Sequence, residues 1–186
     1  MSQPGADASV RQARSNDLPA LGVVQALVWQ QAYDGVVPPE VHAQFQPSAF
    51  ATAWRESLAH PPEGVHRLLV ALAGDQVVGF AALGPSQDPD TGQATGELTA
   101  IGVHPQARRQ GHGSRLLNAV VDMLRELGAD AVTAWALATQ EETRAFLAGA
   151  GLAPDGAYRD RVVGPDGQTA REVRLVAALG EGQSTD

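Results

Sequence analysis

The clearest hydrophobic pattern in the chain lies in residues 97–127, where a short apolar run typical of a strand is followed by the spacing typical of a helix. Residues 97–103 form a short apolar run that is followed by Pro105, which is typical of a strand. Further on, apolar side chains recur three or four residues apart and predict an amphipathic helix that ends at Gly128. These side chains are Leu116, Leu117, Val120, Val121, Leu124 and Leu127. A strand, a turn and a helix therefore form the centre of the predicted fold.

The rest of the chain is predicted to form short strands and helices around this unit. Strands are expected at residues 10–13, 67–73, 77–83, 97–103, 131–137, 157–163 and 170–178, the second with the third and the last two as hairpins. Helices are expected after the capping residues Asp17 and Ser48, and after a capping box that starts at Thr139. Residues 84–96 form a loop long enough to be mobile or to contact a substrate. The strand–helix–strand run from 97 to 137 implies a right-handed crossover between parallel strands.

Composition narrows the class of protein. A chain of 186 residues with 44% hydrophobic and 18% charged residues fits one soluble domain, expected at 9–179 with flexible tails at 1–8 and 180–186. A net charge of −8 argues against a nucleic-acid or anionic-membrane partner. The sequence holds no cysteine, which excludes disulfides and thiolate chemistry. No signal peptide or membrane-spanning run is evident, so a cytoplasmic location is expected.

The turn before the central helix suits a phosphate group. Residues 108–113 read Arg-Arg-Gln-Gly-His-Gly, so free N–H groups and a helix dipole would face a ligand beside two arginines. The plain alternative is that the glycines only form a turn. Two nucleotide motifs fail, because a P-loop needs a lysine where Ser114 stands and a dinucleotide fingerprint needs a glycine where Leu116 stands. Another phosphate-bearing ligand remains.

These residues resemble a known family. Arg108-x-x-Gly111-x-Gly113, placed after Val103-His104-Pro105, is similar to the (Gln/Arg)-x-x-Gly-x-(Gly/Ala) signature with which the GNAT superfamily of N-acetyltransferases binds acetyl-CoA. The order of the elements also resembles that family over nearly the whole chain. The resemblance implies an α/β (α+β) fold, in which a mixed seven-stranded sheet with a central, splayed parallel pair is flanked by about four helices. It also implies acetyl-CoA in the gap, CoA as product, and an amine of a small molecule or protein as acceptor.

The resemblance assigns roles to particular residues. Glu97 would act as the general base that deprotonates the amine, unless it is only a surface carboxylate at a strand start. Backbone N–H groups from Ile101 to Val103 would hold the cofactor, and that of Val103 would polarise the thioester carbonyl. The implied cofactor-binding residues are Ile101, Gly102, Val103, Arg108, Arg109, Gln110, Gly111, His112, Gly113, Ser114 and Gln140. The five histidines are scattered, so no metal site is expected.

The chain departs from the family pattern near its last helix. Where members carry Asn-x-x-Ala-x-x-x-Tyr, this sequence has Gln140, Thr143 and Leu147. In many members the tyrosine protonates the departing thiolate, which Leu147 cannot do, so Tyr158 or water would have to. Two hypotheses stay open: an amine N-acetyltransferase, and a non-catalytic acyl-CoA-binding or regulatory domain.

Two further expectations concern the surroundings of the site. Trp29 and Tyr33 stand four residues apart and either pack in the core or line an acceptor pocket. The chain is also expected to be able to form a homodimer through its C-terminal strands.

Overall fold

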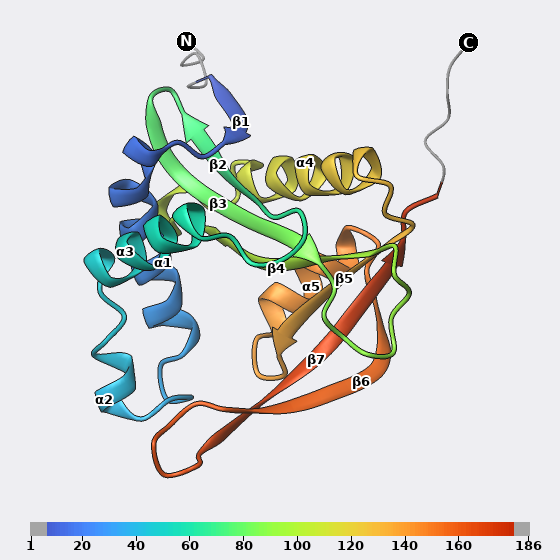
Figure 1. Ribbon diagram of the computed structural model, residues 1–186. Coiled ribbons are helices and arrows are strands. Elements are labelled where there is room, and N and C mark those ends of the chain that lie inside the picture. The colour runs from blue at the N-terminus through green and yellow to red at the C-terminus, as the bar shows by residue number, and fades with distance from the viewer. Residues whose placement is uncertain (1–6, 181–186) are drawn as a thin grey trace.

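The fold is built on one mixed sheet, seen in the computed structural model, which describes residues 7–180 (Figure 1). Its seven strands lie in the order β1-β2-β3-β4-β5-β7-β6. They are β1 (Ala8–Gln12), β2 (Arg67–Ala73), β3 (Gln76–Pro85), β4 (Thr95–Val103), β5 (Ala131–Leu137), β6 (Ala153–Val162) and β7 (Thr169–Ala178). Neighbouring strands are antiparallel except β4 and β5, which are parallel. The predicted mixed sheet with a central parallel pair is confirmed.

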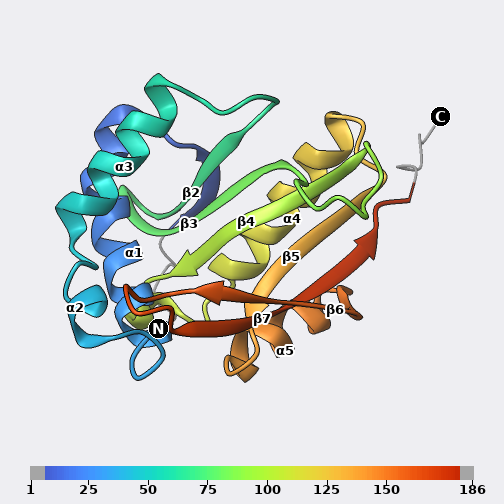
Figure 2. The ribbon, with the colours of Figure 1, turned by 60° about the horizontal axis from the view of Figure 1, so that its bottom comes forward.

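The described residues form five α-helices: α1 (Leu18–Ala32), α2 (Pro39–His42), α3 (Pro47–Ala59), α4 (His112–Glu126) and α5 (Glu141–Gly149). Helices α1 and α3 lie on one face over the N-terminal strands, and α4 and α5 lie on the other (Figures 1 and 2). Within residues 7–180 no helix has both the length and the apolar character needed to cross a membrane. The predicted tails lie largely outside the described residues, although β1 already begins at Ala8.

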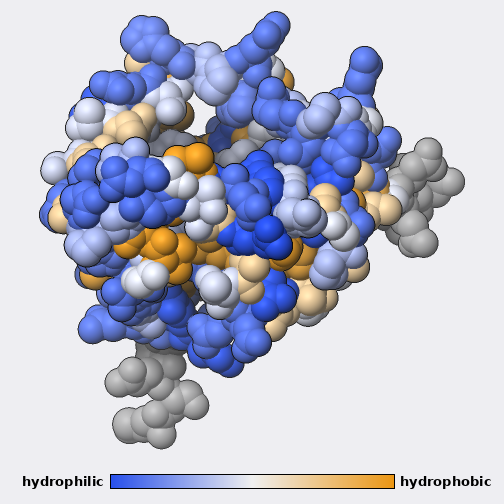
Figure 3. Space-filling model, turned by 90° about the horizontal axis from the view of Figure 1, so that it is seen from below, coloured by the Kyte–Doolittle hydropathy of each residue, from blue (hydrophilic) through white to orange (hydrophobic). Residues whose placement is uncertain are grey.

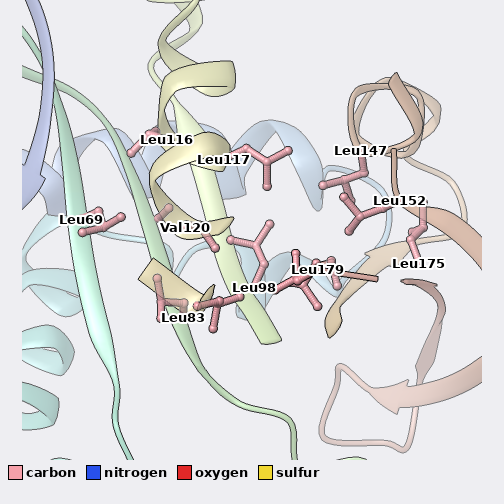
Figure 4. Packing of buried hydrophobic residues seen from close by; sticks show 14 of the residues in the cluster. Leu69, Leu83, Leu98, Leu116, Leu117, Val120, Leu147, Leu152, Leu175 and Leu179 are labelled. Carbon is pink, nitrogen blue, oxygen red and sulfur yellow. The ribbon is translucent and has the colours of Figure 1, made fainter. Parts of the chain in front are cut away.

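Two apolar clusters hold the layers together. The larger one fills the space between the sheet and the α4–α5 layer (Figure 4). The predicted stripe of α4 supplies Leu116, Leu117, Val120 and Leu124 to it, while Leu127 at the helix end is exposed. The smaller cluster packs α1 against β2 and β3 around the fully buried Phe80. Burial of these side chains, at about 25 cal/mol per Å² of apolar surface, is the main force behind the layered arrangement.

The predicted helix caps were wrong in detail. The Asp17 carboxylate does not cap α1; it accepts hydrogen bonds from the Arg14 backbone N–H at 2.7 Å and from the Arg11 guanidinium. Ser48 lies inside α3, because that helix starts at Pro47, whose fixed φ suits a first helical position. Helix α5 starts at Glu141 and has no side-chain cap, so the expected capping box is not formed.

A bulge in β4 decides which way its side chains face. Ala100 pairs with Ala82 and Leu98 with Leu83, which leaves Thr99 as an extra residue. Because side chains alternate along a strand, the extra residue brings Glu97 to the same face as Ala100, the face that α1 covers.

The parallel pair is joined over only four residues. Pairing of β4 with β5 runs from Thr95 with Ala131 to Leu98 with Ala134 and then stops. Beyond this point the two strands diverge toward their carboxyl ends (Figure 2). The expected splay is therefore present, and it opens the site.

Candidate active site

A single large cleft begins where β4 and β5 separate. Its volume is ≈ 1720 Å³, and its walls come from α1, β4, the start of α4, β5, α5 and the β6–β7 hairpin. Seen from below, the middle of the molecule is hollowed, with apolar side chains inside and hydrophilic ones around them (Figure 3). Glu97 and most of the predicted cofactor-binding residues line this one cleft, although they are far apart in the chain.

The free edge of β4 forms one side of the cleft. The His104 N–H donates to the Val78 carbonyl at 2.8 Å, which fixes the hydrogen-bonding phase of the antiparallel β3–β4 ladder. Since bonded and non-bonded pairs alternate, the backbone groups of Ile101 and Val103 point away from β3 and into the gap. Those of Gly102 point toward β3. A side chain at Gly102 would lie 2.8 Å from Phe80, so close packing requires a glycine here, and its predicted contact with the cofactor remains a prediction.

The start of α4 forms the next wall. Gly111 is its N-cap, in a left-handed conformation (φ 83°) that glycine adopts without strain, and no side chain caps the helix. The N–H groups of His112, Gly113 and Ser114 are thus left for a ligand, at the positive end of the helix dipole. A Cβ on Gly113 would lie 3.3 Å from Phe146, so this turn is already closely packed from behind. The arrangement fits a pyrophosphate.

The side chains of the turn are held in different ways. Arg108 donates from Nε to the Val103 carbonyl at 3.2 Å, and Gln110 donates to the Gln106 carbonyl. Arg109 is almost fully exposed and lies 3.7 Å from Glu142, a contact of little energetic value. His112 is only 4% exposed, and its Nδ1 has no hydrogen-bond partner among the described residues. Burial lowers the pKa of His112, which keeps its ring neutral.

Gln140 lies at the opposite side of the cleft and has a structural partner. Its side-chain amide donates to the Ala32 carbonyl at 3.1 Å, which ties the start of α5 to the end of α1. Its amide oxygen accepts from the Thr143 hydroxyl. The predicted contact of Gln140 with the cofactor remains a prediction.

The structure gives the positions of both Leu147, which stands where relatives carry the acidic tyrosine, and Tyr158, which was suggested as its substitute. Leu147 is buried in the larger core cluster. Tyr158 lies on the edge strand β6, is 61% exposed and stacks against Arg171, 4.4 Å from the guanidinium carbon. It does not line the cleft, so the suggestion that Tyr158 supplies the proton was wrong.

Glu97 lies in the cleft and is half-buried. Burial raises the pKa of its carboxyl, the negative charge of Asp88 raises it further, and Arg159 opposes both. The Asp88 carboxylate is itself held by the Trp135 indole N–H at 3.0 Å. A carboxylate with a raised pKa is a stronger base than an ordinary glutamate, which suits the predicted role.

Trp29 and Tyr33 pack among aromatic rings and also line the cleft, and their contact with an acceptor remains a prediction. They belong to a group of packed aromatic rings, with Trp29 5.9 Å from Phe80 and Tyr33 5.6 Å from Phe45 between ring centroids. Both also line the cleft. Burial raises the pKa of the Tyr33 hydroxyl, which therefore stays protonated.

Several charged residues of the cleft floor were not recognised from the sequence. They come from β6 and β7 and include Arg159, Arg161 and Glu172. The buried Glu172 carboxylate accepts from Arg159 Nε at 2.6 Å and lies 3.6 Å from Arg161. The available signal was charge at alternate positions of the two predicted strands, which places these side chains on one face of a hairpin.

The fold and the cleft together define the class of proteins with the GNAT fold.

Comparison with known proteins gives the family. The profile described as Acetyltransferase (GNAT) family matches residues 29–151, more than half of the chain. Mycothiol acetyltransferase of Mycobacterium avium is 42% identical over 82 residues, 44% of this chain and 23% of that protein. Mycothiol acetyltransferase of Thermomonospora curvata is 31% identical over 127 residues, 64% of this chain and 40% of that protein. The chain thus spans less than half the length of these relatives.

Solved structures agree on the fold. A GNAT-family protein from Desulfovibrio desulfuricans has a TM-score of 0.68 at 22% identity, over 93% of this chain and 99% of that one. The yncA protein of Salmonella typhimurium, solved with its cofactor acetyl-CoA, has a TM-score of 0.63 at 17% identity, over 96% and 98%. The chain belongs to the Acetyltransferase (GNAT) family, which confirms the resemblance seen in the sequence and the expected fold.

Proposed function

We propose that the chain is an N-acetyltransferase that moves the acetyl group of acetyl-CoA directly onto a primary amine. The observation that carries this proposal is that one cleft is lined by the free edge of β4, the uncapped start of α4 and Glu97. Membership of the acetyltransferase family supports it, as do relatives named mycothiol acetyltransferase and a structural neighbour that contains acetyl-CoA.

In this proposal different walls of the cleft bind different parts of acetyl-CoA. The N–H groups of His112, Gly113 and Ser114 bind the pyrophosphate of CoA. The backbone groups of Ile101 and Val103 hold the pantetheine arm, as an added strand would be held. The Val103 N–H then donates to the thioester oxygen, where negative charge develops during transfer.

Glu97 makes the acceptor nucleophilic by removing a proton from its ammonium group. The neutral nitrogen attacks the thioester carbonyl carbon, so that a C–N bond forms, the C–S bond breaks and the electron pair leaves with sulfur. The proton taken by Glu97 passes to water. A thiol with a pKa of about 8.5 leaves as a thiolate near neutral pH, so no acid is needed where Leu147 stands.

Release of free thiol from acetyl-CoA tests the proposal. We expect at least one member of a panel of primary amines to accelerate thiol release and to gain 42 Da, the mass of an added acetyl group. The panel would contain amino acids, polyamines, aminosugars and peptides with free N-termini. Binding of acetyl-CoA without transfer to any of them would favour the second candidate, a non-catalytic acyl-CoA-binding domain, which the absence of a tyrosine at Leu147 also favours.

A further inference from the structure

The arginines of the β6–β7 hairpin differ in how fully they are neutralised, and of Arg159, Arg161 and Arg174 only the first two line the cleft. The Arg174 side chain is 7% exposed and is held by three carboxylates, those of Asp90, Asp155 and Asp88, at 2.6, 2.8 and 3.3 Å. Its hydrogen-bonding capacity and charge are therefore already used within the protein. It cannot attract a further anion.

Arg159 and Arg161 are not neutralised in this way. They share a single carboxylate, Glu172, and their side chains remain 42% and 61% exposed. Both line the cleft together with Glu97. A guanidinium has five N–H donors, and Glu172 occupies only part of those available from the two arginines. The pair thus has a net charge of about +1 and free donors facing the cleft.

The positions of the two arginines relative to Glu97 follow from the sheet. The guanidinium carbon of Arg159 lies 4.2 Å from the ring centroid of Trp135, so this side chain reaches back from β6 over β5. Strand β5 is the neighbour of β4, at a spacing of about 4.8 Å. Glu97 and Trp135 are on the same face, because Glu97 pairs with Thr133, two residues before Trp135. The charge of Arg159 acts on Glu97 and lowers its pKa, so the free donors of this arginine lie near the base. Arg161 lies two residues further along β6, opposite Ala170 of β7.

The wall opposite these arginines is apolar. It comes from the end of α1, the following turn and the segment around α2, and it is formed by Trp29, Tyr33, Val37, Val41 and Phe45. The β6–β7 turn contacts this wall, since a side chain at Gly164 would lie 2.7 Å from Pro38. The half of the cleft beyond Glu97 thus offers a cationic floor on one side and an apolar wall on the other.

We propose that Arg159 and Arg161 bind a carboxylate of the acceptor, and that the acceptor is a small carboxylate-bearing amine with an apolar group, such as an apolar α-amino acid. This inference rests on the proposed function. The carboxylate pairs with the arginines, the amine reaches Glu97 directly or through one water, and the apolar group packs against Tyr33 and Phe45. The products are the N-acetyl amide and CoA, and the proton lost by the amine passes through Glu97 to solvent.

A matched set of acceptors tests this. L-phenylalanine carries the carboxylate, while L-phenylalaninamide and 2-phenylethylamine lack it, and rates are compared per neutral amine. We expect kcat/KM for phenylalanine to exceed that of the other two by about 10- to 100-fold, the range for hydrogen bonds to a charged group. Arg161→Gln should remove most of this preference while changing the rates of the uncharged pair by less than about threefold. Arg125→Gln, on the far end of α4, is the control and should leave the preference intact.

The outcomes separate the two proposals. Equal rates for all three acceptors, or a uniform loss in Arg161→Gln, would overturn the carboxylate site while leaving the acetyltransferase function in place. Transfer to polyamines but not to phenylalanine would do the same. No thiol release with any amine would remove the proposed function, and this inference with it.

Discussion

At the scale of single residues, the pKa of Glu97 follows from its burial first and from its charged neighbours second. Burial in the cleft and the charge of Asp88 both favour the protonated carboxyl, and Arg159 opposes them. Only the carboxylate can take a proton from the acceptor. The rate should therefore fall as the pH drops through a pKa that lies above the ordinary glutamate value.

Replacing Glu97 by glutamine tests its role. Glutamine keeps the size and hydrogen bonding of the side chain but cannot accept the proton, so kcat should fall by about 100-fold or more, within the usual range for a general base. The affinity for acetyl-CoA should stay within a few fold. Steady-state kinetics across pH would show whether the acid limb disappears or shifts. Glu126→Gln, on the exposed end of α4, is the control, and an intact acid limb with nearly normal kcat in Glu97→Gln would exclude the residue as base.

Replacing Asp88 by asparagine tests the electrostatic part of this account. A neighbouring negative charge raises a carboxyl pKa, so its removal should lower the pKa of Glu97 and move the acid limb of the pH–rate profile to lower pH. Asp90→Asn is the matched control, because Asp90 pairs with the same Arg174 but is 61% exposed and is not among the charges acting on Glu97. A limb that shifts equally in both variants would trace the effect to Arg174 instead.

At the scale of elements, the long β3–β4 connection is fixed rather than loose. Asp88 and Asp90 of this loop both pair with Arg174 of β7, and Asp155 of β6 joins them. The loop was expected to be mobile or to contact a substrate. The ion pair with Arg174 instead holds Asp88 beside Glu97, so the loop affects the site through the charge of Asp88.

Loss of the ion pairs between Arg174 and this loop should lower the stability of the fold. Arg174→Gln leaves three carboxylates without their common partner, of which Asp88 is largely buried, and we expect the free energy of unfolding to fall by about 3 kcal/mol. Urea unfolding would measure it, and limited proteolysis should cut within residues 86–94 first. Arg171→Gln, on the same strand, removes the exposed pair with Asp160 and should leave the unfolding midpoint nearly unchanged. Similar midpoints for both variants would contradict the anchoring role.

The sequence predicted elements best where periodicity is strong and their ends are marked. Strand β5 was found with the predicted bounds, 131–137, and the stripe on α4 was predicted almost completely. Helix α2 was missed because its four residues are too few to show any period. The helix caps were misplaced because tertiary partners, such as Arg11 for Asp17, compete for the same side chains.

Most of the cleft-lining residues that were expected from the sequence are close together in the chain, whereas Trp29, Tyr33 and Gln140 are not. The stretch from Glu97 to Ser114 forms one strand, turn and helix start, so local pattern was sufficient to identify it. The arginines of β6 were missed because their role depends on contacts across the sheet, such as Arg159 with Glu172 and with Trp135. No local pattern shows which strands will be neighbours.

At the scale of the whole molecule, a ligand in the cleft would touch both halves of the sheet and helices from both layers. Between β4 and β5 the halves are joined by only four residue pairs. A ligand that bridges them should therefore stabilise the entire fold.

Thermal unfolding with and without acetyl-CoA measures this effect. A ligand at about 100 times its Kd adds about 2.7 kcal/mol, or roughly 5–10 °C in Tm for a chain of this size. Gly113→Asp should abolish the shift, because it crowds Phe146 and places negative charge beside the pyrophosphate. Gly149→Asp adds the same charge where there is open space and should keep the shift. A full shift in Gly113→Asp would mean that the pyrophosphate lies elsewhere.

The bulge at Thr99 determines the face of β4 on which the base lies. Strict alternation backward from Ile101 would place position 97 on the α4 side, and the extra residue reverses this. A strand of the same length without the bulge would present Leu98 to the cleft instead. Loss of Thr99 alone would remove the bulge and leave Glu97 on its present face, whereas straightening the strand at unchanged length would turn the base away without a change of side-chain chemistry.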